Sequence, residues 1–181
     1  MGSELTLKKT ALWTAGAVAV VLLVTLILPR LMMPGTTYKS FEGHPFPDIS
    51  VVDAQQNNVA LRDLFRSEGP QKTILALWAT WCEPCLKELP VLARLQGKFL
   101  EKGYRLVLIN YDGGVPDKTI PEVSAWLLAQ KLDLHTFYDF QSSLLDGLGI
   151  TSLPFAMRVG ETGNVEWMKE GLLDWEKFEL P

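Results

Sequence analysis

The segment Trp78-Ala-Thr-Trp-Cys-Glu-Pro-Cys85 contains both cysteines of this 181-residue chain. It follows the continuous apolar run Thr73–Trp78, which is typical of a strand buried on both faces. It precedes a predicted helix over 83–101, in which leucines and Phe99 recur at helical spacing and after which Gly103 is the expected stop. Both cysteines are therefore predicted to lie where a buried strand passes into a helix.

This placement favours redox chemistry. A thiolate at a helix N-terminus faces unpaired N–H groups and the positive end of the helix dipole, which lowers its pKa. Pro84 is tolerated there because the first N–H groups of a helix have no partner in any case. We expect Cys82 to be the exposed nucleophile that attacks a disulfide, and Cys85 to be the buried thiol that resolves the mixed disulfide.

Other roles for the two cysteines fit the sequence less well. A zinc site needs two more ligands, and His44 and His135 stand singly without ligand spacing. A structural disulfide would close a very small loop and add little stability, and inert buried cysteines need neither Pro84 nor a helix N-terminus. A Cu(I) metallochaperone is the non-enzymatic alternative, since thiolates suit Cu(I), although no Met or His joins the pair at a useful spacing. We expect no metal or other cofactor.

From residue 43 onward, apolar runs alternate with helical patterns, which predicts an α/β fold with a mixed central sheet flanked by helices. Strands are predicted over 49–52, 58–61, 73–78, 105–111, 134–138, 155–159 and 165–169. Further helical segments are predicted over 63–66, from the capping box at 119–122 to 131, and over 174–180. The segment 112–117 follows a strand end, where it could shape substrate choice or form a simple loop.

The segment Trp78–Cys85 resembles the active-site stretch of thioredoxin-like proteins, in which a Trp precedes the first Cys. Pro90 matches the proline that kinks the active-site helix in that family. Ser152-Leu-Pro-Phe155 is similar to the loop whose cis-proline, here Pro154, lies against the redox pair. The resemblance covers about residues 43–173 and implies a thioredoxin-like fold. An ordinary turn proline is the alternative for Pro154.

One departure from thioredoxin narrows the resemblance. Ala76 stands where thioredoxin has a buried Asp, and Glu88 matches a glutamate characteristic of the membrane-tethered branch known as ResA, TlpA and CcmG. A carboxylate there could accept the proton of the second thiol and disfavour an early thiolate. A solvated helix face is the alternative for Glu88. The resemblance thus implies four catalytic residues, which are Cys82, Cys85, Glu88 and Pro154.

That branch reduces its clients during cytochrome c or cytochrome oxidase maturation. The resemblance therefore implies clients that carry disulfides, apocytochrome c among them, and a transmembrane thiol reductant as the electron donor. A peroxiredoxin-type peroxidase is the enzymatic alternative. Its motif requires Thr or Ser three residues before the attacking Cys and Pro seven before, where this chain has Ala79 and Leu75.

The N-terminal part of the chain predicts a membrane anchor. Residues 11–28 are uncharged, and as a helix they would span roughly 27 Å, close to the thickness of a bilayer core. A cleaved signal peptide is the alternative, but no small-residue cleavage site follows the apolar run. Lys8 and Lys9 favour a cytoplasmic N-terminus. The expected order is a cytoplasmic segment 1–10, a transmembrane anchor 11–28, a tether 29–42 and a thioredoxin-like domain 43–181 on the periplasmic side.

The charge balance excludes one class of partner. The chain carries 17 Lys and Arg against 21 Asp and Glu, a formal net charge of −4. Because nucleic acid requires a basic face, no nucleic-acid partner is expected.

Overall fold

The computed structural model describes residues 18, 20–27, 41–66, 72–113 and 119–178. The chain divides into two compact units, Met1–Thr37 and Tyr38–Pro181. The described part of the first unit is helical and includes the π-helical turn η1 (Leu23–Ile27). Among the described residues, no helix is both long enough and apolar enough to cross a membrane. The predicted segment 1–10, much of the predicted anchor 11–28 and nearly all of the tether lie outside the described residues.

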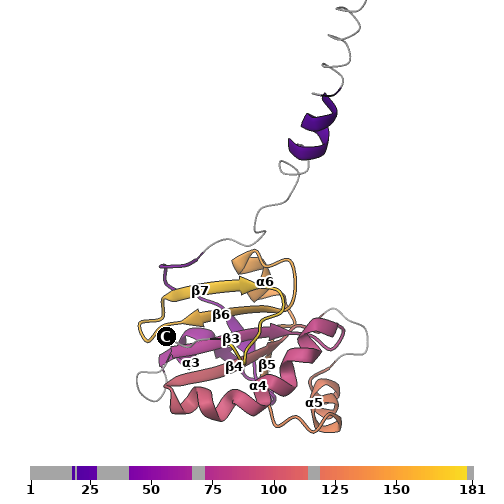
Figure 1. Cartoon of the computed structure of the whole chain (residues 1–181). Helices are drawn as coiled ribbons and strands as arrows, with labels where there is room; N and C mark the ends of the chain where they lie inside the picture. The colour runs from indigo at the N-terminus through magenta and orange to yellow at the C-terminus, as the bar shows by residue number, and fades with distance from the viewer. Residues whose placement is uncertain (1–17, 19, 28–40, 67–71, 114–118, 179–181) are drawn as a thin grey trace, which may run out of the picture. The chain divides into compact units, whose positions relative to one another are not determined.

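The second unit is built on a seven-stranded mixed sheet (Figure 1). Its order is β2-β1-β5-β4-β3-β6-β7, in which β3, β4 and β5 run parallel and the other neighbours are antiparallel. The strands are β1 (Ser50–Val52), β2 (Asn58–Ala60), β3 (Lys72–Trp78), β4 (Tyr104–Asn110), β5 (Thr136–Tyr138), β6 (Phe155–Val159) and β7 (Val165–Glu170).

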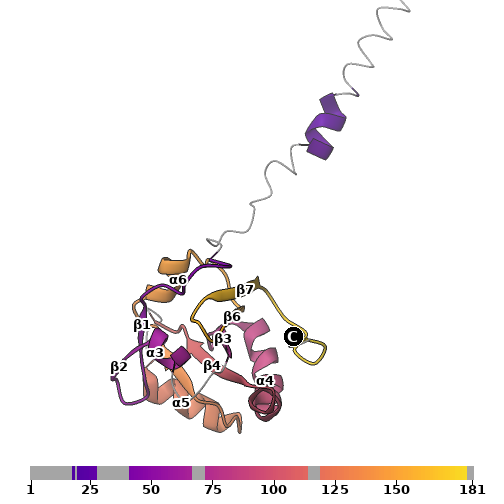
Figure 2. The same cartoon turned by 90° about the vertical axis from the view of Figure 1, so that its left-hand side faces the viewer.

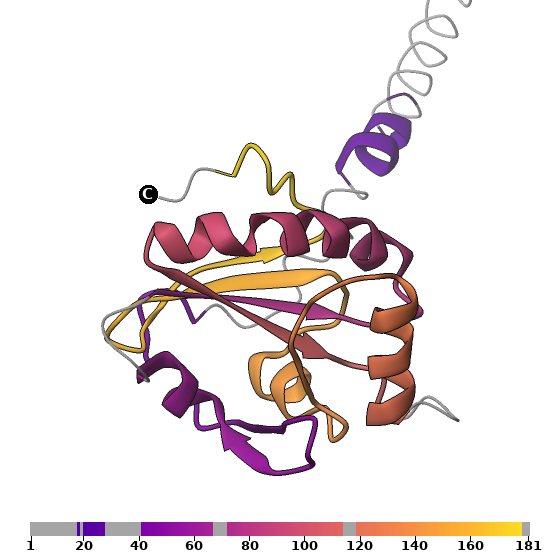
Figure 3. The same ribbon diagram turned by 90° about the horizontal axis from the view of Figure 1, so that it is seen from below.

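Helices cover both faces of this sheet (Figures 2 and 3). The long helix α4 (Glu83–Glu101) packs on one face, and α5 (Ile120–Ala129) joins the same core. The short helices α3 (Leu61–Arg66) and α6 (Ser143–Leu148) pack on the other face. Successive side chains of a strand point to opposite faces. Ala76 accordingly lies in the core under α4, whereas Leu75 and Leu77 lie in the opposite core, so β3 is buried on both faces as its apolar run predicts.

The predicted α/β fold with a mixed sheet is confirmed, and most element boundaries agree within about two residues. The helix predicted over 174–180 is wrong for its described part, 174–178, which forms only a turn. Both the backbone carbonyl and the side chain of Asp174 accept the N–H of Lys177, which closes a single turn around Trp175, whose ring packs on Phe99 of α4.

Helix α6 was not predicted, although its sequence carries a local signal. Leu144, Leu145 and Leu148 are buried at helical spacing, and Gly149 follows with the left-handed backbone that ends many helices. The carboxylate of Asp139 accepts the N–H groups of Ser143 and Leu144, which satisfies two of the unpaired donors at the helix start.

Candidate active site

The two cysteines form a disulfide at the N-terminus of α4. Their sulfur atoms are 2.00 Å apart and their Cα atoms 5.3 Å apart. Cys82 is the N-cap residue of the helix, and its Sγ accepts the backbone N–H of Cys85 at 3.3 Å. Pro84 stands in the first turn, where it removes no intrahelical hydrogen bond. The predicted position of the pair, between a buried strand and a helix N-terminus, is confirmed.

The cysteine pair is less exposed to solvent than the sequence predicts. Cys85 is buried as predicted, but Cys82 is only 4% exposed, so the prediction of an exposed Cys82 is wrong for this disulfide form. The preceding loop folds over the helix start, where the N–H of Cys82 donates to the carbonyl of Ala79. Trp81, by contrast, is 56% exposed. The surface beside the pair is therefore an indole ring, with the Cys82 sulfur recessed next to it.

The loop before β6 lies at the end of the sheet where β3 passes into the loop that carries Cys82. Because Phe155 pairs with Leu77 in the antiparallel β3/β6 ladder, the residue before Phe155 lies at the end of β3 from which the chain runs on to Cys82. That residue is Pro154, which is buried and follows a cis peptide bond. The cis conformation expected at Pro154 is confirmed.

A buried carboxylate anchors the cysteine loop to the end of β4. Asp112 is 0% exposed, and its carboxylate accepts the backbone N–H of Thr80 at 3.0 Å and the Thr80 hydroxyl at 3.1 Å. It also accepts the side-chain amide of Asn110 at 2.9 Å. Thr80 lies two residues before Cys82. Sequence reasoning placed the segment 112–117 near the active site but missed this contact, and residues 114–118 lie outside the described part.

The loops after β4 and β5 pack closely against each other. A Cβ atom on Gly113 would lie 2.5 Å from the Cα of Phe140, so only glycine fits there without a shift. The N–H of Asp139 donates to the carbonyl of Asn110 at 3.0 Å. Burial raises the pKa of the Asp139 carboxyl, which the N–H groups that it accepts partly oppose.

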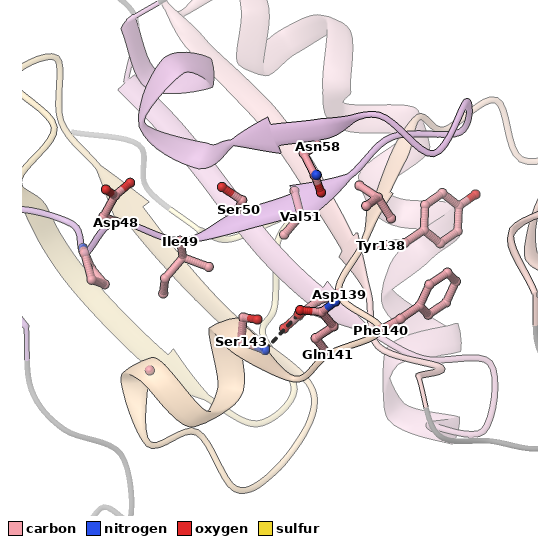
Figure 4. A pocket seen from close by; sticks show the side chains of 13 residues that line it. Asp48, Ile49, Ser50, Val51, Asn58, Tyr138, Asp139, Phe140, Gln141 and Ser143 are labelled. Carbon is pink, nitrogen blue, oxygen red and sulfur yellow. Dashed lines mark hydrogen bonds between the residues drawn. The ribbon is translucent and has the colours of Figure 1, made fainter.

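A cavity of about 540 Å³ lies between β1 and α6. Asp139 and Tyr138 are among the residues that line it (Figure 4). Neither cysteine lines this cavity. The side chain of Asp139 is turned toward Ser143, whose N–H it accepts, so the carboxylate serves the start of α6 (Figure 4). This hollow is therefore separate from the disulfide.

Glu88 lies one helical turn after Cys85 and is only 7% exposed. Its Oε1 accepts the backbone N–H of Leu173 at 2.6 Å. Burial raises the pKa of this carboxyl, while the N–H of Leu173 and the indole N–H of Trp175 favour the ionised form and partly oppose that shift. The alternative of a solvated helix face is therefore wrong for Glu88. It holds for its neighbour Lys87, which is exposed and pairs with Glu83 at 2.9 Å.

The recessed cysteine pair lies at a helix N-terminus, next to a cis-proline loop, on a mixed sheet that helices cover on both faces. This combination defines a thioredoxin-like thiol–disulfide oxidoreductase. The chain belongs to the AhpC/TSA family, whose model matches residues 43–168. The predicted membership of the thioredoxin-like oxidoreductases is thereby confirmed.

Relatives of known name agree with this assignment. The chain is 27% identical over 145 residues to the thiol-disulfide oxidoreductase ResA of Bacillus thuringiensis subsp. konkukian (strain 97-27), covering 77% of this chain and 79% of that protein. It is 28% identical over 109 residues to the sporulation thiol-disulfide oxidoreductase A of Bacillus subtilis (strain 168), covering 60% and 65% respectively. The protein is accordingly an oxidoreductase that acts on client proteins containing disulfides.

Solved structures show the same fold. StoA from Bacillus subtilis superposes with a TM-score of 0.55 at 24% identity, covering 70% of this chain and 90% of that one. A thiol:disulfide interchange protein of the thioredoxin family from Chlorobium tepidum TLS superposes with a TM-score of 0.54 at 21% identity, covering 71% and 86%.

Proposed function

We propose that the protein is a membrane-tethered reductase of disulfides in extracytoplasmic client proteins. The observation that supports an exchange led by one of the two cysteines is the asymmetry of the pair. The Sγ of Cys82 caps the helix N-terminus and accepts the N–H of Cys85, so a thiolate at Cys82 would be stabilised, while Cys85 is held inside the protein. Cys82 is therefore the proposed nucleophile and Cys85 the resolving thiol.

The proposed exchange has two steps that balance in atoms and electrons. The Cys82 thiolate attacks one sulfur of a client disulfide, which forms a mixed disulfide and releases the first client thiolate. The Cys85 thiolate then attacks the Cys82 sulfur, which closes the Cys82–Cys85 disulfide and releases the second client thiolate. The client gains two electrons and the protein loses two, so a donor must reduce the pair again. A transmembrane thiol reductant is the proposed donor.

Glu88 is proposed to accept the proton of Cys85 before the second step. Glu88 is buried one helical turn from Cys85, and the pKa of its carboxyl is raised. Its proton affinity is therefore closer to that of a thiol than the proton affinity of a solvated Glu would be. Its negative charge would also disfavour a thiolate on Cys82 and so raise the pKa of that thiol. A less stabilised reduced form is more easily oxidised, which makes the pair a better reductant.

Pro154 is proposed to form one wall of the client site. Pro154 is buried at the end of the sheet where β3 passes into the cysteine loop. Its own loop therefore lies at the same end of the sheet as the recessed Cys82. The exposed ring of Trp81 provides an apolar contact on the surface beside the pair. A client segment would thus lie across the end of β3.

Cytochrome c maturation is the proposed setting. The Cys-Glu-Pro-Cys sequence and Glu88 resemble the tethered branch that carries out this task, and an uncharged run of bilayer length at 11–28 supports an anchor with the domain on the periplasmic side. Apocytochrome c, or the copper-site cysteines of an oxidase subunit, are the proposed clients.

Trapping of the client tests the proposed roles. In Cys85→Ala the second step is blocked, so a mixed disulfide through Cys82 should accumulate and should dissolve on addition of dithiothreitol. The matched control is Cys82→Ala, which should trap nothing. A trapped complex in Cys82→Ala and none in Cys85→Ala would reverse the assignment. Mass spectrometry of the trapped species identifies the client.

The anchor has a separate test. Carbonate extraction should leave the full chain in the membrane pellet, and protease added to spheroplasts should digest the domain that begins at residue 43. Release of a shortened chain into the soluble fraction would show that the apolar segment is a cleaved signal peptide.

A further inference from the structure

The chain after β7 connects the cis-proline loop with Glu88. The N–H of Gly171 donates to the carbonyl of Pro154 at 2.8 Å, and two residues later the N–H of Leu173 donates to the Glu88 carboxylate. We call residues Leu172–Phe178 the C-terminal segment. It crosses α4 (Figure 3) and lines a cavity of about 470 Å³ that Glu88 also lines. Glu88 is therefore covered by a segment that the proposed mechanism has not used.

Within this segment, Trp175 has an unusual environment. Its ring is buried and packs against Phe99 and Phe178, with centroid separations of 6.2 Å and 5.4 Å. Its Nε1 is buried and makes no hydrogen bond to any described residue. A buried indole N–H without a partner is unfavourable, so the packing of the ring does not by itself explain a tryptophan here. Trp175 and Glu88 line the same cavity, and the indole favours the ionised form of the Glu88 carboxyl, which lowers its pKa against the rise that burial causes.

The charged side chains around Glu88 are already paired. Lys87, Asp174 and Glu176 line the same cavity, and all three are exposed. Their ion-pair partners are Glu83 for Lys87, Lys177 for Asp174 and Arg94 for Glu176. Exposed ion pairs of this kind exert weak fields on a buried group. The N–H groups of the C-terminal segment therefore remain as the close stabilisers of the Glu88 carboxylate.

We propose that Trp175 is a positioning residue of the redox site. The backbone N–H of Leu173 holds the Glu88 carboxylate one helical turn from Cys85, and the indole N–H of Trp175, unpaired among the described residues and on the same cavity, is the donor that the carboxylate engages when it is ionised. The C-terminal segment, together with Gly171 just before it, thus links this carboxylate to the cis-proline loop. The inference rests on the proposed role of Glu88, and it adds the element that sets when Glu88 is charged.

The test measures the ionisation of Glu88 directly. The sample is the full chain in detergent, in the disulfide form so that neither cysteine titrates. The ¹³C resonance of the Glu88 carboxyl is followed against pH. It is assigned by its absence in Glu88→Gln. Trp175→Phe keeps an aromatic ring but removes the N–H that favours the ionised form. The midpoint should rise by roughly half a pH unit, which is about a threefold change in the ratio of ionised to protonated carboxyl at a fixed pH.

Trp167→Phe is the matched control. Trp167 also buries an Nε1 that bonds to none of the described residues, and it packs on the same Phe178 at 5.1 Å, but it does not line the cavity of Glu88. The Glu88 midpoint should not move in this variant. An unchanged midpoint in Trp175→Phe, or an equal shift in both variants, would overturn the proposal.

A measurement on the unmutated chain covers the case in which Trp175→Phe fails to fold. The ¹H–¹⁵N signal of the Trp175 indole should titrate with the same midpoint as the Glu88 carboxyl, and that of Trp167 should stay constant. Alkylation of reduced Cys82 against pH then separates the two proposals. If the Glu88 midpoint moves in Trp175→Phe while the alkylation profile does not, the positioning role stands and the proposed redox role of Glu88 fails.

Discussion

Replacing Asp112 should loosen the loop that carries the nucleophilic cysteine. In Asp112→Ala, three donors lose their acceptor: the N–H and hydroxyl of Thr80 and the side-chain amide of Asn110. A buried donor left without a partner costs about 1–3 kcal/mol. Asn110 is fully buried, while Thr80 is half-buried and water can replace part of its loss. We therefore expect the free energy of unfolding to fall by about 3–4 kcal/mol.

Urea unfolding of the disulfide form measures this loss, with the denaturant slope checked for constancy among variants. Asp112→Asn keeps one carbonyl oxygen as an acceptor and should lose about 1–2 kcal/mol. Asp133→Ala removes the same charge from an exposed position and should change stability by less than about 0.5 kcal/mol. A loss below about 1 kcal/mol in Asp112→Ala, or equal losses in the Ala and Asn variants, would show that the carboxylate does not anchor the loop.

Three further outcomes follow from the buried groups. Burial raises the pKa of Glu88 above its ordinary value of 4.5, so its contribution to stability is complete below that pH and is lost as the pH rises through the folded pKa. Glu88→Gln, which keeps an acceptor for Leu173, should therefore show a Tm that falls less than that of the unmutated chain as the pH rises from 4.5. Gly113→Ala should lose about 1–3 kcal/mol in urea unfolding, because its Cβ would meet the backbone of Phe140; an unchanged midpoint would mean that the two loops separate freely. Leu108→Ala, in the core under α4, should lose about 2–5 kcal/mol in the same assay, and a smaller loss would mean that the core collapses around the cavity.

Much of the fold and of the site was predicted from short stretches of neighbouring residues. The apolar run of β3 and the cysteines at a helix start are each specified by residues adjacent in the chain, so the buried strand and the position of the redox pair were predicted from the residues themselves. The cis bond at Pro154 was predicted from the resemblance of its loop to that of thioredoxin-like proteins, because an X-Pro bond is trans in most cases. Helix α6 had a local signal as well, in its three leucines and the following glycine, and could have been found. The helix expected over 174–180, which is wrong for the described residues 174–178, shows the limit of such signals, because a short segment adopts the turn that packing permits.

What only the tertiary structure decided is which polar groups are buried, and by what. Glu88 and Lys87 are neighbours in α4, but Lys87 is exposed and Glu88 is buried. Glu88 is covered by the segment around Leu173, which lies 85 residues further along the chain. Asp112 holds Thr80 across 32 residues, and Cys82 is recessed although its neighbour Trp81 is exposed. Periodicity predicts which face of an element is apolar, since it depends on neighbours in the chain. Desolvation and hydrogen bonding depend on the segments that pack over that face, and these meet it only when the chain has folded.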